Sequence, residues 1–387
     1  MTDEPANKAP STAPATFLKT GHFSRHATWL ELFYDLVYVV VIAKLAHLIT
    51  HPHDHHVTLH QYVLFVGLFV PVWWAWTGHT MFQNRFDPDD IPHKILTLLQ
   101  MLAACFMAVF ITGAFGEGAN AFALSYVAIR ILLIVMYWRV HRLGGDHTKV
   151  TRLFLTGFSC GALFWLVSVF VPGPWKFWLW GAGLLVDMVT PWIGRKRLAR
   201  VSVHAAHLPE RLGLLTIIVL GESVVSIIGG IEGGDVAAQT LVASAFGFLL
   251  LGSIWWLYFH SLETSLMDGV YTNGQLAIYG HLPVYLGLVT IAAGVRFGIN
   301  GAVSSADMGI LLCGGMLLFL LPLQIIHWSR LSGRRASQFV IINLILNAVL
   351  VGIGLMSSQL PHIWLLGIVA LVYTAYVVFE TPKYSQA

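Results

Sequence analysis

The sequence predicts an all-α, polytopic integral membrane protein with about twelve transmembrane helices. Hydrophobic residues make up 57% of the 387 residues and charged residues only 11%, whereas soluble domains carry about 25% charged residues. The apolar residues lie in long runs, as helices that cross a bilayer require. Lys and Arg are concentrated in every second connection between these runs and near both termini, which fits an even number of membrane crossings.

Twelve apolar segments reach the length of roughly 20 residues that a spanning helix needs. Very short connections separate several of them, such as residues 172–174, so consecutive helices are expected to be antiparallel neighbours. The expected spans are 28–50, 60–79, 93–113, 119–139, 150–171, 175–193, 211–231, 236–259, 276–298, 302–326, 336–357 and 362–380.

The loop charges predict the orientation, because Lys and Arg are enriched in cytoplasmic loops. With the N-terminus placed in the cytoplasm, the opposite loops hold essentially only Lys176. We therefore expect a multi-pass protein of the cell (inner) membrane with both termini in the cytoplasm. The basic residues on the predicted cytoplasmic side are Lys8, Lys19, Arg25, Arg85, Arg139, Arg142, Lys149, Arg195, Lys196, Arg197, Arg200, Arg330, Arg334, Arg335 and Lys383.

The order of the spans suggests a duplication. The pairs Trp73–Trp74 and Trp255–Trp256 are 182 residues apart, and spans one to six match spans seven to twelve at a similar offset. Six spans per half would make the repeat parallel, about an axis along the membrane normal; a chance register is the alternative. The predicted units are a disordered cytoplasmic tail (1–24), a first six-helix repeat (25–194), a basic cytoplasmic linker (195–210) and a second six-helix repeat (211–387).

Among the charged residues inside predicted spans, where a charge costs about 2.5–3.5 kcal/mol on insertion scales, five stand out. Glu31 and Asp35 are four residues apart and share one helix face. Glu222 and Arg130 lie near the predicted midplane, and Asp187 lies lower in its span. Arg130 is the natural counter-ion for Glu222, Asp187 or Asp35. Purely structural roles remain open: Glu31 suits a helix N-terminus, and the other acids can order the bundle as ion pairs.

Two long motifs resemble the signatures of the bacterial low temperature requirement A family. The segment RHATWLELFYDLVYV (25–39) resembles the N-terminal signature, and ERLGLLTIIVLGE (210–222) resembles the second. The resemblance covers residues 22 to 380 and implies a membrane protein without an established biochemical activity. It adds His26, Glu210 and Arg211 as signature residues, although Glu210 also suits the start of a helix.

The first external loop, HPHDHH (51–56), is rich in histidine. Imidazoles at this spacing can bind Zn²⁺, Cu²⁺ or Ni²⁺ or respond to pH, but a solvated loop explains them equally. We predict no metal site; the weak candidates are His51, His53, His55 and His56. Walker A, H-E-x-x-H, nucleophile-elbow and C-x-x-C motifs do not occur in the sequence. We therefore expect no catalytic residues, no cofactor and no enzyme activity. The basic residues lie in short loops and do not indicate a nucleic-acid partner.

Two functions fit these observations. The first is a proton-coupled secondary transporter, because repeat transporters bind substrate between their repeats near mid-membrane. Its expected partners are the lipid bilayer and a proton or a small-molecule substrate. The second is a non-transporting sensor or an envelope and cold-adaptation protein whose buried charges lock the bundle. A lipid-modifying enzyme is less well supported, because no nucleophile constellation is present. The candidates for binding substrate or protons are Glu31, Asp35, Arg130, Asp187 and Glu222.

Overall fold

The computed structural model describes residues 27–52, 54–86, 88–145, 147–198, 207–232, 237–267, 275–329 and 331–384. The predicted tail 1–24 lies outside these ranges, as do the signature residue His26 and the loop residue His53. The described chain is helical almost throughout. Its elements are α1 (Trp29–Thr50), α2 (Leu59–Phe86), α3 (Ile91–Phe110), α4 (Ala119–Arg142), α5 (Thr148–Ser168), α6 (Trp175–Ile193), α7 (Arg195–Leu198), α8 (His207–Glu232), α9 (Ala238–Met267), α10 (Gln275–Asn300), α11 (Ser305–Trp328), α12 (Gly333–Met356), η2 (Ser357–Gln359) and α13 (His362–Tyr384).

Eleven of the described helices are long and apolar enough to cross a membrane, which confirms the predicted all-α, multi-span class. The remaining long helix, α6, occupies the sixth predicted span and carries Lys176 and Asp187 within 19 residues. The count of twelve spans therefore stays a prediction, as do the six-plus-six repeat and the cytoplasmic placement of the termini.

Helix α2 continues seven residues beyond the predicted end of its span, to Phe86. The added turns carry the polar residues Thr80, Gln83 and Asn84, yet all three are buried. Hydropathy marks a span by its apolar run, so it misses helical turns whose polar side chains are covered by protein rather than by lipid.

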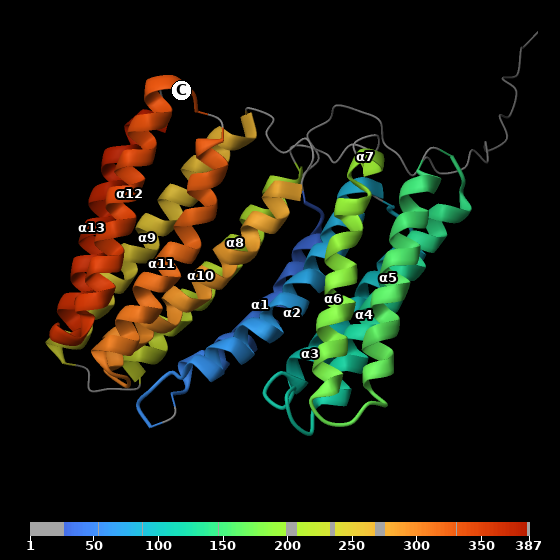
Figure 1. Cartoon of the computed structure of the whole chain (residues 1–387), viewed down its shortest axis with the longest axis horizontal. Coiled ribbons are helices and arrows are strands. Elements are labelled where there is room, and N and C mark those ends of the chain that lie inside the picture. The colour runs from blue at the N-terminus through green and yellow to red at the C-terminus, as the bar shows by residue number, and fades with distance from the viewer. Residues whose placement is uncertain are drawn as a thin grey trace, which may run out of the picture.

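The helices form two groups that lie side by side in Figure 1, with α1 to α6 on the right and α8 to α13 on the left. The contact between the groups is made mainly by α1 and α2 against α8 and α10. The start of α1 and the end of α13 lie at the same end of the bundle (Figure 1). Any functional movement of one group against the other must therefore involve these four helices.

The helix most enclosed by protein is α10, in which 83% of the residues of the most apolar stretch are buried. It packs against α8, α9, α11 and α13 and also against α1 and α2. Its contact with α11 is close because glycines face backbone: a Cβ on Gly287 would lie 2.6 Å from the amide nitrogen of Phe319, and one on Gly315 would lie 2.9 Å from that of Ile291. Small residues of this kind allow membrane helices to approach closely.

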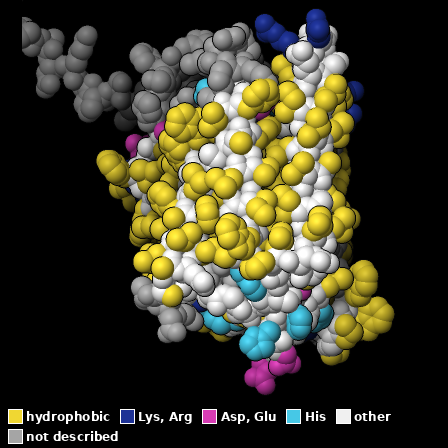
Figure 2. Space-filling view, turned by 90° about the vertical axis from the view of Figure 1, so that its left-hand side faces the viewer, with side chains coloured by type: hydrophobic (Ala, Val, Ile, Leu, Met, Phe, Trp, Pro, Cys, Tyr) yellow, Lys and Arg dark blue, Asp and Glu magenta, His cyan; other side chains and the backbone are white. Residues whose placement is uncertain are grey.

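The outer face of α12 and α13 has the character of a lipid-facing surface. Figure 2 shows hydrophobic side chains over the height of this face, with Lys and Arg at its upper end and His and acidic residues at its lower end. Only 22% of the residues in the most apolar stretch of α12 are buried.

The two tryptophan pairs that suggested the duplication differ in burial. Trp73 and Trp74 are buried, whereas Trp255 and Trp256 are about half exposed.

Candidate functional site

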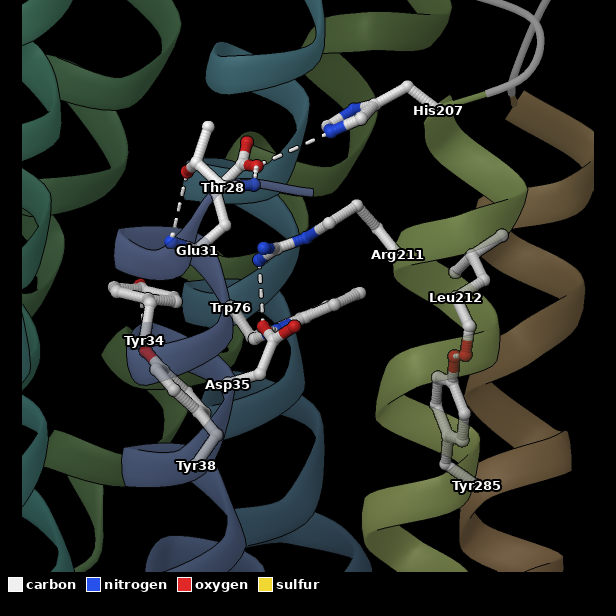
Figure 3. Close-up of polar contacts among 10 residues, drawn as sticks. All are labelled: Thr28, Glu31, Tyr34, Asp35, Tyr38, Trp76, His207, Arg211, Leu212 and Tyr285. Atoms are coloured by element: carbon white, nitrogen blue, oxygen red, sulfur yellow. Dashed lines mark hydrogen bonds and ion pairs between the residues drawn. The ribbon is translucent and has the colours of Figure 1, made fainter. Parts of the chain in front are cut away.

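The first residues of α1 fix the direction of its two carboxylates. Thr28 and Glu31 form a capping box, in which each side chain accepts a hydrogen bond from the other residue's backbone amide. Such a box satisfies two amides that lack partners within the helix. Because Glu31 and Asp35 are one helical turn apart, this start points both acids toward α8 (Figure 3). Glu31 thus has the first-turn role that the sequence allowed, in addition to the contacts described next.

Asp35 forms a buried ion pair across the contact between the two helix groups. Arg211 Nη2 lies 2.7 Å from Asp35 Oδ1, and Trp76 Nε1 donates to the same oxygen at 2.8 Å (Figure 3). Asp35 and Arg211 are both inaccessible to solvent. At this separation and in a low dielectric, the attraction is much stronger than between surface charges. The pair links α1 directly to α8.

A second set of contacts joins the same two helices one turn nearer their starts. Glu31 Oε2 lies 3.4 Å from Nε2 of His207, the first residue of α8, and Glu31 also interacts electrostatically with Arg211. Glu210 accepts a hydrogen bond from the backbone amide of Ala27 at 3.2 Å. Glu210 therefore holds the start of α1, which goes beyond the capping of its own helix that the sequence suggested.

Aromatic and imidazole rings surround this cluster. The rings of Tyr34 and His79 stack with centroids 4.0 Å apart, and the hydroxyl of Tyr34 donates to that of Tyr38 at 3.3 Å. The ring of His93 lies 6.2 Å from that of His79. A line of titratable groups thus extends from Asp35 toward the start of α3.

The line ends at a partly exposed carboxylate outside the membrane-spanning segments. Asp90 caps α3 through the backbone amide of His93 and pairs with Arg139. Partial burial opposes ionisation of Asp90, but the hydrogen bonds from Arg139 and His93 outweigh it and hold the pKa of this carboxyl below its usual value. Asp90 is therefore a fixed negative charge at neutral pH.

A small cavity adjoins the Asp35–Arg211 pair on the side away from the start of α1. Tyr38, Trp73 and Trp76 line it from the first helix group, and Leu215 and Tyr285 line it from the second. The space between these side chains is about 240 Å³. Tyr285 is fixed by donating its hydroxyl hydrogen to the carbonyl oxygen of Leu212 at 2.9 Å (Figure 3).

Several polar atoms around the ion pair lack a hydrogen-bond partner among the described residues. They include Asp35 Oδ2 and two guanidinium nitrogens of Arg211. Buried polar groups are normally paired with protein or with ordered water. The cluster therefore has capacity to bind water, a proton or the polar group of a small molecule.

Arg130 and Asp187 form a separate cluster inside the first helix group. Arg130 Nε lies 2.9 Å from Asp187 Oδ2, and both residues are fully buried. Tyr126 connects them: its hydroxyl donates to Asp187 at 3.1 Å and accepts from Arg130 Nη2 at 2.7 Å. Of the three acids that the sequence offered as partners of Arg130, the structure places Asp187 beside it. This bridge ties α4 to α6.

Gly161 on α5 is the close neighbour of this bridge. A Cβ at this position would collide with Oδ1 of Asp187, whereas a Cβ on Gly181 of α6 would meet nothing within 4 Å. We expect Gly161→Ala to lower the free energy of unfolding by about 1–3 kcal/mol more than Gly181→Ala, because overpacking must displace the carboxylate. Unfolding in mixed detergent micelles, followed by tryptophan fluorescence, measures the difference. Equal stabilities of the two variants would contradict the close contact.

Glu222 belongs to neither cluster. It is 11 residues beyond Arg211 on α8, or about 16 Å along the helix at 1.5 Å per residue. It interacts electrostatically with Arg296 on α10, and its side chain is only partly buried. The five candidate residues thus form three separate sets rather than one site.

The histidine-rich loop contacts the second helix group. His56 Nδ1 lies 2.7 Å from Asp307 Oδ2. His55 Nδ1 lies within hydrogen-bond distance, 3.1 Å, of the carbonyl oxygen of Ala302. Asp54 and His55 have positive φ angles. In the part of the chain that the structure describes, no three His, Cys, Asp or Glu side chains are placed to hold a metal ion.

The fold and the buried charges define a multi-pass helical membrane protein in which ion pairs join two groups of helices. Residues 26–375 match the model of the family described as bacterial low temperature requirement A protein. The chain belongs to this family. It is also similar to an uncharacterised protein of Rhizobium meliloti (strain 1021), with 26% identity over 311 residues, covering 76% of this chain and 75% of that protein.

Sequence reasoning did not identify His79 or His207 as members of the site. Both lie outside the two signature motifs. His79 had a usable signal, because an imidazole within a predicted spanning helix is expected to face protein rather than lipid. The pairing of Asp35 with Arg211 also had a signal, since each is a charge near a predicted membrane edge and each lies in one of the two family motifs.

Proposed function

We propose that this protein is a proton-coupled secondary transporter in which Asp35 carries the proton. The observation that supports it is the fully buried Asp35–Arg211 pair, which joins the first helix of one group to the first helix of the other. Bilayer-depth charges are costly, and a buried ion pair is weak evidence for stability alone. Asp35 and Arg211 lie where the two helix groups would move against each other. A change in the charge of this pair would therefore switch the contact between the groups.

Protonation of Asp35 would remove one charge of the pair and weaken the contact between α1 and α8. Arg211 would then keep Glu31 as a counter-ion, because Glu31 already interacts with it. The guanidinium can thus exchange one carboxylate for the other without becoming an unpaired buried charge, which would cost several kcal/mol. Two such arrangements of one arginine give the two states that coupled transport requires.

The line through Tyr34, His79 and His93 supplies titratable or hydrogen-bonding groups between Asp35 and the start of α3. At the opposite end of the groups, the His56–Asp307 contact holds the first loop against α11. The cavity beside Asp35 would widen as the helices separate. In this proposal Glu222 does not carry the coupled proton, because it interacts electrostatically with Arg296 and is remote from the cluster.

The test is transport by the full-length protein in liposomes that enclose a pH-sensitive dye. After the external medium is acidified, we expect proton entry that depends on one or more solutes from a panel of amino acids, organic acids, sugars and organic cations. Asp35→Asn should abolish this solute-dependent entry, and Glu222→Gln should retain it.

Two results would contradict the proposal. One is wild-type protein that gives no solute-dependent proton entry with any member of the panel. The other is full coupling in folded Asp35→Asn protein. Size-exclusion profiles and thermal unfolding serve as the control for folding of both variants.

A non-transporting protein with structural ion pairs is the second candidate. The observation in its favour is that Asp35 and Asp187 each form an ion pair with an arginine of the chain, and that Glu31 interacts electrostatically with Arg211. Under this function, Asp35→Asn lowers stability and no solute changes proton entry, so the same two measurements separate the candidates.

A further inference from the structure

The polar end of α2 contains a buried arginine that has no carboxylate partner among the described residues. Arg85 is 6% exposed. Its side chain interacts with the hydroxyl of Tyr137 and lies over the ring of Phe154, 5.5 Å from the centroid. Neither neighbour neutralises it, and its Nε has no hydrogen-bond partner within the described chain. A buried guanidinium without a counter-ion is costly, and it favours an anionic ligand.

Arg85 lines a cavity between α2, α4, α5, α6 and the start of α10. The space between the lining side chains, part of which is open to solvent, is about 380 Å³. Aromatic rings form much of its wall, from Trp74, Tyr137, Phe154, Phe158 and Tyr279. A cavity with one charge and aromatic walls suits a ligand with one charged end and an apolar body.

Thr77 gives this cavity a second polar contact. Its side chain is 3% exposed and lines the space, and its hydroxyl oxygen has no hydrogen-bond partner among the residues described. Thr77 and Arg85 are eight residues apart on α2, or about two helical turns, so they share a face. A hydroxyl and a guanidinium on one face are typical donors to a carboxylate.

The Arg130 cluster borders the same cavity without adding net charge. Gly78 lines the space, and a Cβ on Gly78 would lie 2.8 Å from Arg130 Nη1. Asp187 balances the charge of Arg130. Among the described residues, Arg85 is therefore the cation of this wall whose charge no carboxylate balances, and it matches a ligand with a single negative charge.

We propose that this cavity binds a small organic monocarboxylate with an aromatic or alkyl body, its carboxylate held by Arg85 and Thr77. Arg85 forms charge-assisted hydrogen bonds to the carboxylate, and the rings of Trp74 and Tyr279 cover the apolar part. The site does not depend on transport, since a protein that only senses or binds such an acid would use it equally.

The test is equilibrium binding of benzoate to the full-length protein in nanodiscs, measured by calorimetry and by tryptophan fluorescence. We expect benzoate to bind and the neutral isostere benzamide to bind at least roughly tenfold more weakly, since hydrogen bonds to charged groups are worth about 1.5–3 kcal/mol. Arg85→Gln should weaken benzoate binding by roughly 10- to 100-fold for the same reason. Arg85→Lys, which keeps the positive charge, should retain part of the benzoate affinity.

Two further variants sharpen the test. Thr77→Val removes the hydroxyl at nearly constant volume and should weaken benzoate binding by roughly threefold to tenfold, as the loss of one hydrogen bond implies. Arg142→Gln is the matched control: Arg142 is an exposed arginine on α4 that lies over Trp138, and its loss should leave binding unchanged. Dodecanoate distinguishes the source of the ligand: tighter binding than benzoate indicates a lipid-derived acid, and weaker binding indicates a soluble one.

Three results would overturn the proposal. The first is no binding of benzoate or dodecanoate to the wild-type protein. The second is unchanged benzoate binding in folded Arg85→Gln protein. The third concerns Asp87, which lies outside the described residues: if benzoate binds only to Asp87→Asn, Arg85 is already paired in the native protein. Asp35→Asn should bind benzoate normally, so failure of this site and failure of proton coupling remain distinguishable.

Discussion

Replacing Arg211 by alanine is expected to lower the free energy of unfolding by about 3–5 kcal/mol, because it leaves a buried charge unpaired. Asp35 would lose its 2.7 Å partner, and Glu31 would lose its electrostatic interaction with Arg211. Asp35→Asn should cost less, since Arg211 still faces Glu31 and Trp76 still has an oxygen to donate to. Unfolding of the full-length protein in mixed micelles measures both values.

The matched control for Arg211→Ala is Arg139→Ala. Arg139 also pairs with an aspartate, Asp90, but both side chains are partly exposed, and exposed pairs contribute only about 0.2–1 kcal/mol. The double variant Asp35→Leu/Arg211→Met removes both charges at once. It should recover most of the lost stability, as replacement of buried ion pairs by apolar side chains does elsewhere. A small effect of Arg211→Ala alone would mean that water reaches the pair in the native state.

Arg130→Ala is the second substitution with a large expected effect, again about 3–5 kcal/mol. It leaves Asp187 fully buried with only the hydroxyl of Tyr126 as a donor, and it empties a space that the Arg130 side chain fills against Phe158. Arg142→Ala on the same helix, where the side chain is exposed, should change stability by less than about 0.5 kcal/mol. The same unfolding assay compares the two variants.

The two clusters make different predictions for function. Asp187→Asn should retain solute-dependent proton entry, because the Arg130 bridge lies within one helix group, between α4 and α6. Loss of coupling in Asp187→Asn protein of normal stability would show that the two clusters act together. That result would require revision of the assignment of the coupled proton to Asp35 alone.

Hydropathy predicts the helices well and the site only in part, for a physical reason. The apolar runs of α1, α4 and α11 are long, and their predicted spans agree with the structure to within a few residues. The last two turns of α2 are polar, and only the surrounding helices make them a buried part of the bundle. Local sequence does not reveal this kind of burial.

The choice of partners among buried charges is likewise a property of helix packing. Their positions within the predicted spans place Arg130 and Glu222 at a similar depth in the membrane, yet they belong to different helix groups. The acid that lies beside Arg130 is Asp187 on α6. For Asp35 the partner is Arg211 in the first turns of α8, a residue predicted from the sequence only as part of the second family motif. The energetic rule that buried charges pair was sufficient to expect a partner, but not to identify it.

The enclosure of α10 has a consequence for how the chain is assembled after synthesis. Alone in lipid, this helix would expose His281 and Thr290, which the finished protein buries. Its glycine-mediated fit to α11 means that the following helix is the first to cover it, so the two are suited to leave the insertion machinery as a hairpin. The hairpin then docks on α1, α2 and α8, which were synthesised earlier, and α13 closes the remaining side. The order of helices along the chain thus matches an order of assembly in which the most enclosed helix is never left for long in the bilayer by itself.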